Sequence, residues 1–265
     1  MPTLRLVQID AFSKTAFGGN PAAVMPLESW LEDDILQAIA VENNLSETAF
    51  YLPAKDDPEA DFELRWFTPG LEIALCGHAT LATGAHILRE GWARNSVIFR
   101  TRKAGLLEVR RNGEGFEVSL PAYPPAPKAL PEAVAALDAE PLETHFHEGR
   151  YSLYLYENED QVRALAPDMR ALAAIGDWQF IATAPGSETD VVSRVFVPGA
   201  GVDEDPVTGS AHAVLTPFWA ERLGRDRFTA FQASARGGHV GCRLDGDRAV
   251  LSGHCATVIE GEFFF

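Results

Sequence analysis

The chain carries two copies of one short pattern, and the copies lie half a chain apart. Residues 75–79 and residues 207–211 each place a glycine at the start of an uncharged segment of small residues. These glycines, Gly77 and Gly209, are 132 positions apart in a chain of 265 residues. A repeat at this spacing predicts two domains of one fold, because each copy must then build its own core.

Other segments repeat in the same order with nearly the same spacing. Their offsets run from 129 to 134 positions, and five ordered matches are difficult to obtain by chance. We therefore predict a duplicated fold in which residues that differ at matching points have unequal roles. The further matches are residues 65–70 with 194–199, residues 34–39 with 168–172, Gly105 with Gly238, and Gly113 with Gly246.

A proline-rich segment separates the two copies. Five of the residues from 121 to 131 are prolines, which have a fixed φ and no N–H and so avoid helix interiors and central strands. We predict that residues 121–131 link an N-terminal domain of residues 1–120 to a C-terminal domain of residues 132–265. Both lengths are ordinary for a domain.

Each half alternates predicted strands with helices. Alternation of apolar and polar residues predicts strands, and a broad apolar stripe at helical spacing predicts the first helix. The predicted elements are strands over 4–12, 49–52, 63–67 and 97–100, a helix over 28–42, and hairpins over 106–120 and 240–251.

The segments after the repeated glycines are predicted to be the central helices. Residues 79–88 and 211–220 have no charged side chain, and a helix that is apolar on every side is buried on every side. Pro217 is expected to kink the second helix. The prediction for each half is an α+β domain, a mostly antiparallel sheet wrapped around one helix.

Charge and cysteine content exclude several classes of protein. The formal net charge is −16, which makes nucleic acid and anionic membranes poor partners. No run approaches the roughly 18 apolar residues of a membrane span, and residues 1–5 do not begin a signal peptide. Three cysteines, an odd number, favour a reducing cytoplasm over a disulfide framework.

Glu47 is the first candidate for chemistry. It lies where a predicted helix gives way to a strand, and an offset of 132 places it on Gln179. One copy is therefore ionisable and the other neutral, as expected for a single general base. The alternative is a loop carboxylate that is exposed or satisfied by nearby backbone N–H groups.

The two predicted helix N-termini are candidate anion sites. Each offers unpaired N–H groups and about half a positive charge, and Gly77 and Gly209 allow close approach of a ligand. Such sites bind a carboxylate or stabilise an oxyanion formed in a reaction. The alternative is ordinary helix capping by glycine or serine.

Polar side chains flank both helix N-termini. His78 follows Gly77, and the positive end of the helix dipole predicts that its imidazole is neutral. Asp205 precedes the second helix, where the alternative role is an N-cap, and Ser210 occupies the position that matches His78.

Two further residues are candidates for substrate contact. Asn20 lies in a glycine-rich segment, residues 17–21, and Arg236 could face a substrate carboxylate. The alternative for Arg236 is a turn between two strands. No G-x-G-x-x-G pattern opens a helix after a strand, so a dinucleotide fold is not expected.

Six segments, taken in order, resemble the PhzF-like family of phenazine-biosynthesis isomerases. The resemblance implies the diaminopimelate-epimerase-like fold, with two pseudo-symmetric α+β domains and an active site in the cleft between them. It implies no cofactor, no metal, a small-molecule carboxylate substrate and a homodimer. The segments are residues 10–12, 17–24, 46–50, 65–69, 76–80 and 205–211.

The resemblance also implies roles for individual residues. Glu47 looks like the acid/base that takes a proton from carbon and returns it elsewhere. Gly77 looks like a backbone N–H donor to the substrate. The supporting polar groups implied by the resemblance are His78, Asp205 and Ser210.

Cysteine chemistry is disfavoured at this site. Related epimerases and racemases use two thiols, one in each half, but Cys76 is matched by Thr208 in the second half. A zinc site made of Cys76, His78, His254 and Cys255 is conceivable from residue types, although these spacings are unlike those of zinc sites.

The leading hypothesis is a cofactor-independent isomerase that moves a proton on a small carboxylate-bearing substrate. One alternative is an epimerase or racemase of a small amino or hydroxy acid. Another is a ligand-binding or scaffold protein that has lost catalysis on the same fold. The presence of all four polar candidates, Glu47, His78, Asp205 and Ser210, argues against this last alternative.

Overall fold

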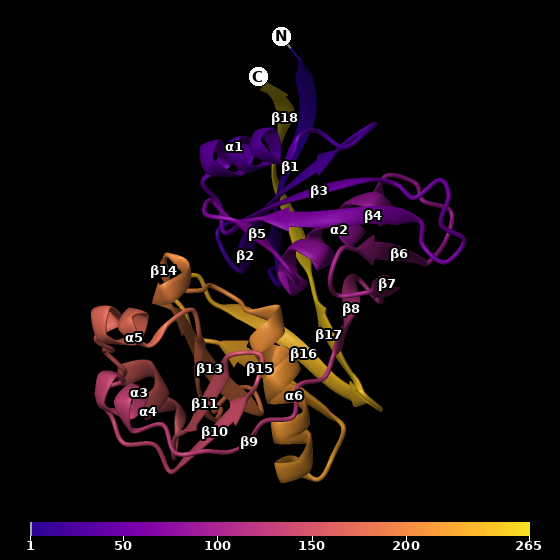
Figure 1. Ribbon diagram of the computed structural model, residues 1–265. Helices are drawn as coiled ribbons and strands as arrows, with labels where there is room; N and C mark the ends of the chain where they lie inside the picture. The colour runs from indigo at the N-terminus through magenta and orange to yellow at the C-terminus, as the bar shows by residue number, and fades with distance from the viewer. Residues whose placement is uncertain (1) are drawn as a thin grey trace. The chain divides into compact units, whose positions relative to one another are not determined.

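The computed structural model describes residues 2–265 and contains two compact units (Figure 1). Unit 1 comprises the chain up to Leu120 together with Ser252–Phe265, and unit 2 comprises Pro121–Leu251. Residues 252–265 therefore belong to unit 1, whereas the prediction assigned all of residues 132–265 to the second domain.

The last strand explains this difference. Strand β18 (Cys255–Phe264) pairs antiparallel with β1 (Thr3–Ala11) along the whole length of β1. Without β18, one edge of β1 would present a row of unpaired N–H and C=O groups. Pairing between strands so distant in sequence leaves no local signal, and the repeat spacing cannot reveal it.

Unit 1 is built on one mixed sheet in the order β18–β1–β2–β3–β4–β6–β7–β8, with the short β5 also pairing with β4. All pairings are antiparallel except β2–β3 and β4–β6. The remaining elements are β2 (Asn20–Pro26), α1 (Asp33–Asn43), β3 (Glu47–Pro53), β4 (Phe62–Phe67), β5 (Glu72–Ile73), α2 (Gly77–Arg89), β6 (Ser96–Thr101), β7 (Leu106–Asn112) and β8 (Gly115–Pro121).

Helix α2 is the predicted central helix of unit 1. Every residue from Gly77 to Leu88 is buried, and the helix contacts β1, β2, β3, β6 and β7. A side chain at Gly84 would place its Cβ 2.4 Å from Val109, so the small residue permits close helix–sheet packing. Thr83 satisfies its buried hydroxyl by donating to the Ala79 carbonyl oxygen.

Unit 2 repeats this plan with the sheet order β9–β10–β11–β12–β13–β15–β16, and β14 also pairs with β13. Its elements are β9 (Ala126–Pro127), α3 (Pro131–Ala136), β10 (Glu143–His147), β11 (Tyr151–Leu155), α4 (Glu159–Ala164), α5 (Met169–Ile175), β12 (Gln179–Pro185), β13 (Val191–Val197), the 3₁₀ turn η1 (Pro198–Ala200), β14 (Val202–Glu204), α6 (Gly209–Leu223), β15 (Arg227–Gln232), β16 (Gly238–Asp245) and β17 (Arg248–Gly253).

Parallel and antiparallel strand pairs follow one another in the same order in both units. In unit 2 the parallel pairs are β11–β12 and β13–β15, which match β2–β3 and β4–β6 of unit 1. One detail differs from the sequence comparison. Gly105 has φ +70° and its counterpart with φ +65° is Gly237, not Gly238. The left-handed turn requires glycine at position 237. Gly105 therefore matches a residue one position earlier than the one that the sequence comparison paired with it.

The proline-rich segment is part of unit 2 and is not a free linker. Pro217 lies inside α6 and has no N–H to donate to the carbonyl oxygen of Ala213, four residues earlier. The N–H of Tyr123 donates to that oxygen instead, at 3.0 Å. The same segment supplies β9, which pairs with β10.

Although both central helices are apolar, no helix within residues 2–265 is both long and apolar enough to cross a membrane.

An arginine with the same contacts occupies the same place in both units, and it is buried in unit 1. The Arg65 guanidinium donates to both carboxylate oxygens of Glu72 and lies 5.0 Å from the ring centroid of Phe67. Arg194 makes the same pair of contacts with Glu204 and Phe196. This repeated ion pair strongly supports the duplication.

Replacing Arg65 by leucine is expected to lower the free energy of unfolding by about 3 kcal/mol, because the change leaves Glu72 without its buried partner. The Arg65 side chain is 3% exposed, whereas Arg102, which also contacts Glu72, is 52% exposed. The control Arg102→Leu should therefore cost less than about 1 kcal/mol. Urea denaturation measures both, and equal losses would contradict this role for Arg65.

Candidate active site

A carboxylate and an imidazole meet at the start of the central helix of unit 1. Glu47 is the first residue of β3 and His78 is the second residue of α2. Glu47 Oε2 lies 3.0 Å from His78 Nε2, with the two side chains 15% and 4% exposed. The contact lacks the alignment of a hydrogen bond, and neither buried atom has another such partner within residues 2–265. Both atoms are thus available to a ligand.

Asn20 contacts the other ring nitrogen of the imidazole. Its Nδ2 lies 3.2 Å from His78 Nδ1. In a neutral ring, donation from this amide to Nδ1 leaves the ring proton on Nε2, on the Glu47 side, whereas a charged ring carries a proton on both nitrogens. The predicted contact residue Asn20 therefore lies next to the predicted acid/base pair, as the first residue of β2.

The pKa of His78 is shifted in the direction opposite to the prediction. Burial alone would lower the pKa of His78, but its neighbours Cys76 and Glu47 outweigh burial and raise it well above the ordinary value. Burial, with the charge of Glu47, raises the pKa of the Cys76 thiol to about 11, so this thiol is protonated near neutral pH. The neighbouring side chains thus outweigh the partial charge of a helix terminus, which was the basis for predicting a neutral ring.

The N-termini of both central helices lack a side-chain cap among the described residues. Gly77 and Gly209 are the first helical residues, and Cys76 and Thr208 are the N-caps. Neither N-cap side chain hydrogen-bonds to its helix in the part of the chain that the structure describes. First-turn N–H groups of this kind are suited to binding an anion.

Unit 2 makes the same contact as unit 1 with neutral groups. Gln179 is the first residue of β12 and Ser210 is the second residue of α6. The amide Nε2 of Gln179 lies 2.8 Å from the Ser210 hydroxyl oxygen. The pair Gln179–Ser210 is therefore the uncharged counterpart of Glu47–His78, and within these matched pairs only unit 1 has groups that can exchange a proton.

A glutamine that the sequence did not reveal holds the loop before α6. Gln232 accepts from the Thr208 N–H at 2.8 Å and donates to the Asp205 carbonyl oxygen at 2.7 Å. The Thr208 hydroxyl donates to the Asp205 carboxylate. Asp205 lies three residues before the N-cap and is oriented by these contacts. A glutamine at the end of a strand carries no sequence signal, because its partners are 24 and 27 residues away.

Arg236 lies in the turn between β15 and β16 and is half-buried. In that turn the Ser234 hydroxyl donates to the Pro206 carbonyl oxygen at 2.7 Å and accepts from the Gly237 N–H at 3.1 Å. The turn is thereby attached to the loop before α6. Contact between Arg236 and a substrate stays a prediction.

One group of possible metal ligands is found among the described residues. Glu47, Cys76 and His78 each offer a donor atom, and these atoms lie within 4.8 Å of one another. His254 and Cys255, which residue types also suggested, do not belong to this group.

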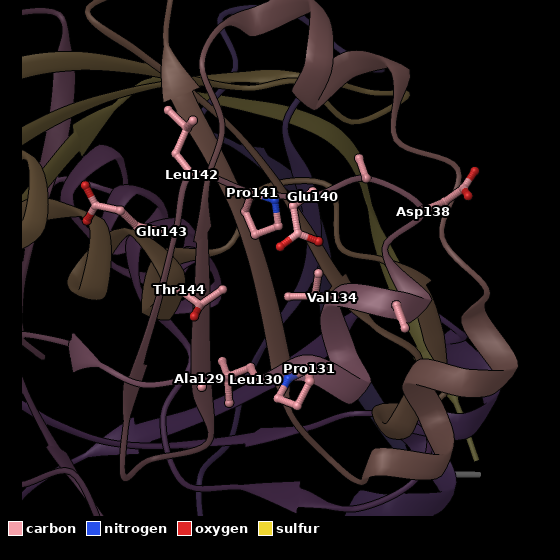
Figure 2. A pocket seen from close by; sticks show the side chains of 12 residues that line it. Ala129, Leu130, Pro131, Val134, Asp138, Glu140, Pro141, Leu142, Glu143 and Thr144 are labelled. Atoms are coloured by element: carbon pink, nitrogen blue, oxygen red, sulfur yellow. The ribbon is translucent and has the colours of Figure 1, made fainter.

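A separate pocket of about 690 Å³ lies in unit 2, between α3, β10 and the segments on either side of α3 (Figure 2). Its lining is mainly alanine, proline and leucine, with carboxylates from Asp138, Glu140 and Glu143. In Figure 2, Glu140 and Pro141 lie beside Val134 of α3. None of the candidate site residues lines this pocket.

Comparisons with known proteins agree over nearly the whole chain. A sequence profile of the phenazine biosynthesis-like protein family, PhzC-PhzF, matches residues 9–261. A Pseudomonas aeruginosa protein named as an uncharacterized isomerase is 44% identical over 97% of this chain and 98% of its own length. A crystal structure of a PhzF-family phenazine biosynthesis protein from Enterococcus faecalis matches with a TM-score of 0.90 at 39% identity, over 100% of both chains.

A more distant structure shares the fold. A hydroxyproline epimerase from Agrobacterium vitis, crystallised with trans-4-hydroxy-L-proline, matches with a TM-score of 0.65 at 13% identity, over 98% of this chain and 92% of that one. The predicted diaminopimelate-epimerase-like α+β fold, with one helix enclosed by a sheet in each unit, is confirmed. The comparisons also support an isomerase class of activity.

Proposed function

This chain belongs to the phenazine biosynthesis-like family, and we propose that it is a cofactor-independent isomerase acting on a small carboxylate-bearing substrate. The observation that carries the proposal is the buried contact between Glu47 Oε2 and His78 Nε2. It supports the proposal because a carboxylate beside an imidazole at a helix N-terminus can act as an acid/base pair.

The proposed reaction moves one proton and changes no oxidation state. Glu47 Oε2 takes a proton from a substrate carbon, and the electron pair of that C–H bond shifts into the substrate. The same carboxyl group then returns the proton to another carbon. The N–H groups of the first turn at Gly77 stabilise the negative charge that develops on the substrate.

His78 and Asn20 support this step in the proposal. The imidazole lies between Glu47 and the Asn20 amide, so its position is set from both sides. A positive charge on His78 would stabilise the carboxylate form of Glu47 before proton transfer. By the resemblance, the proposal keeps Asp205 and Ser210 as supporting polar groups, and Gly209 and Arg236 stay predicted substrate contacts.

An epimerase or racemase is the second candidate. The hydroxyproline epimerase shares the fold, and Glu47 would serve as one of two bases. A pair of thiols is disfavoured as those bases, because the Cys76 thiol is protonated near neutral pH and Thr208 takes the matching position in unit 2.

Deuterium incorporation from solvent separates the candidates. The protein is incubated in D₂O with a panel of small cyclic and amino carboxylates, and each compound is examined by NMR. Deuterium at carbon with a moved double bond supports the isomerase, and deuterium with inversion of a stereocentre supports the epimerase. A tightly bound compound that shows no exchange would favour a binding protein.

Cys76→Ser is expected to keep its exchange rate within about tenfold of the original protein, since loss of a general acid or base costs about 10²- to 10⁴-fold. Serine preserves a small polar side chain at the N-cap, and the thiol it replaces is protonated. The rate of deuterium incorporation measures the effect. Complete loss of exchange in a folded Cys76→Ser protein would restore the thiol mechanism.

A further inference from the structure

Three different donor atoms converge at the N-terminus of α2. Besides the contact of 3.0 Å between Glu47 and His78, the Cys76 sulfur lies 3.5 Å from His78 Nδ1. One donor atom from each of the three side chains lies within 4.8 Å of the others. Metal–ligand bonds of about 2.0–2.3 Å hold neighbouring donors roughly 3–4 Å apart, so one ion would bind a single nitrogen of His78 and draw the three donors slightly closer together.

A second observation points to a missing ligand. His78 Nε2 and Glu47 Oε2 are buried, yet neither makes an aligned hydrogen bond within the described residues. The His78 side chain is more than nine-tenths buried. Buried polar atoms are ordinarily satisfied, and an ion bridging the nitrogen and oxygen would satisfy both.

We propose that Glu47, Cys76 and His78 form a binding site for a divalent zinc-class cation that inhibits the protein. A carboxylate, a thiolate and an imidazole form a donor set that zinc accepts, and three protein ligands leave a fourth position for water or a substrate carboxylate. Binding releases protons: the Cys76 S–H bond and the N–H bond at the coordinating His78 nitrogen break, their protons pass to solvent, and metal–sulfur and metal–nitrogen bonds form. No electron is transferred.

Inhibition follows from which atoms the cation occupies. A metal bound to Glu47 and His78 takes the carboxylate lone pair that would accept the substrate proton. This consequence rests on the proposed function, whereas metal binding does not. The two are therefore tested separately, with binding measured in the absence of any substrate.

Cobalt(II) provides the binding test, because a cobalt–thiolate bond gives a charge-transfer absorption in the near ultraviolet. The purified full-length protein is titrated with Co²⁺ alone, and Zn²⁺ is then added as the competitor. The variant is Cys76→Ser and the matched control is Cys255→Ser, which changes another buried free cysteine of the same unit.

We expect the thiolate band in the original protein and in Cys255→Ser, its loss in Cys76→Ser, and displacement of Co²⁺ by Zn²⁺. Zinc affinity should fall roughly a hundredfold in Cys76→Ser, since the softest of the three donors is lost. Absence of the band from the original protein, or an equal band in Cys76→Ser, would overturn the site. If the band behaves as expected but zinc leaves deuterium exchange unchanged, the metal site stands and the assignment of Glu47 as the base fails.

Discussion

Glu47→Gln is expected to reduce deuterium incorporation into substrate by about a thousandfold or more, as loss of a general base does. The amide cannot accept a proton from carbon, yet it has nearly the same size as the carboxylate. Gln179 of unit 2 shows that a glutamine fits the equivalent position and contacts the second residue of its helix at 2.8 Å. The variant should therefore fold normally and lose only the chemistry.

Ligand affinity distinguishes a chemical defect from a structural one. Glu47→Gln should bind any substrate of the original protein with an affinity within about tenfold, a difference of about 1.4 kcal/mol. The control is Glu42→Gln, an exposed carboxylate of α1, which should retain full exchange. Normal exchange in Glu47→Gln would remove Glu47 from the mechanism.

Gly19→Ala is expected to lower the free energy of unfolding by about 2–4 kcal/mol. Gly19 has φ +64°, which costs a residue with a side chain about 1–2 kcal/mol. In addition, an added Cβ would lie 2.0 Å from the carbonyl oxygen of Ala11. Ala11 is held between Asn20 and Cys255 in the sheet, so the clash must displace the backbone.

Gly105→Ala isolates the cost of the backbone conformation. Gly105 has a similar φ of +70°, but no other atom lies within 4 Å of an added Cβ. Its loss should be only about 1 kcal/mol by urea denaturation. Equal losses at the two positions would show that the Ala11 clash relaxes at little cost.

Gly19→Ala should also weaken catalysis, because the next residue, Asn20, contacts His78.

Much of the candidate site was predictable because the duplicated sequence allows one half to be compared with the other. The offset matched Glu47 with Gln179 and His78 with Ser210, and the structure places each pair at equivalent positions. The central helices were also predictable, since an uncharged helix must be buried from all sides. These inferences use local pattern and spacing alone.

The charge of His78 and the role of Gln232 were not predictable in the same way. The dipole of α2 is a local property of the sequence and predicted a neutral imidazole. The opposing contributions come from Cys76 and from Glu47, which is 31 residues earlier in the chain, and sequence does not report a distance of 3.0 Å. Gln232 likewise acts through contacts with Asp205 and Thr208 that exist only after folding.

The sequence by itself determined the duplication, the α+β class, the two buried helices and the set of residues able to do chemistry, because periodicity, burial and residue type are written locally along the chain. Tertiary structure alone decided that β18 completes the sheet of unit 1, that Cys76 joins Glu47 and His78 in one cluster, and that the imidazole lies beside a carboxylate. The physical reason is that pKa values, metal affinity and strand pairing depend on distances between residues far apart in sequence.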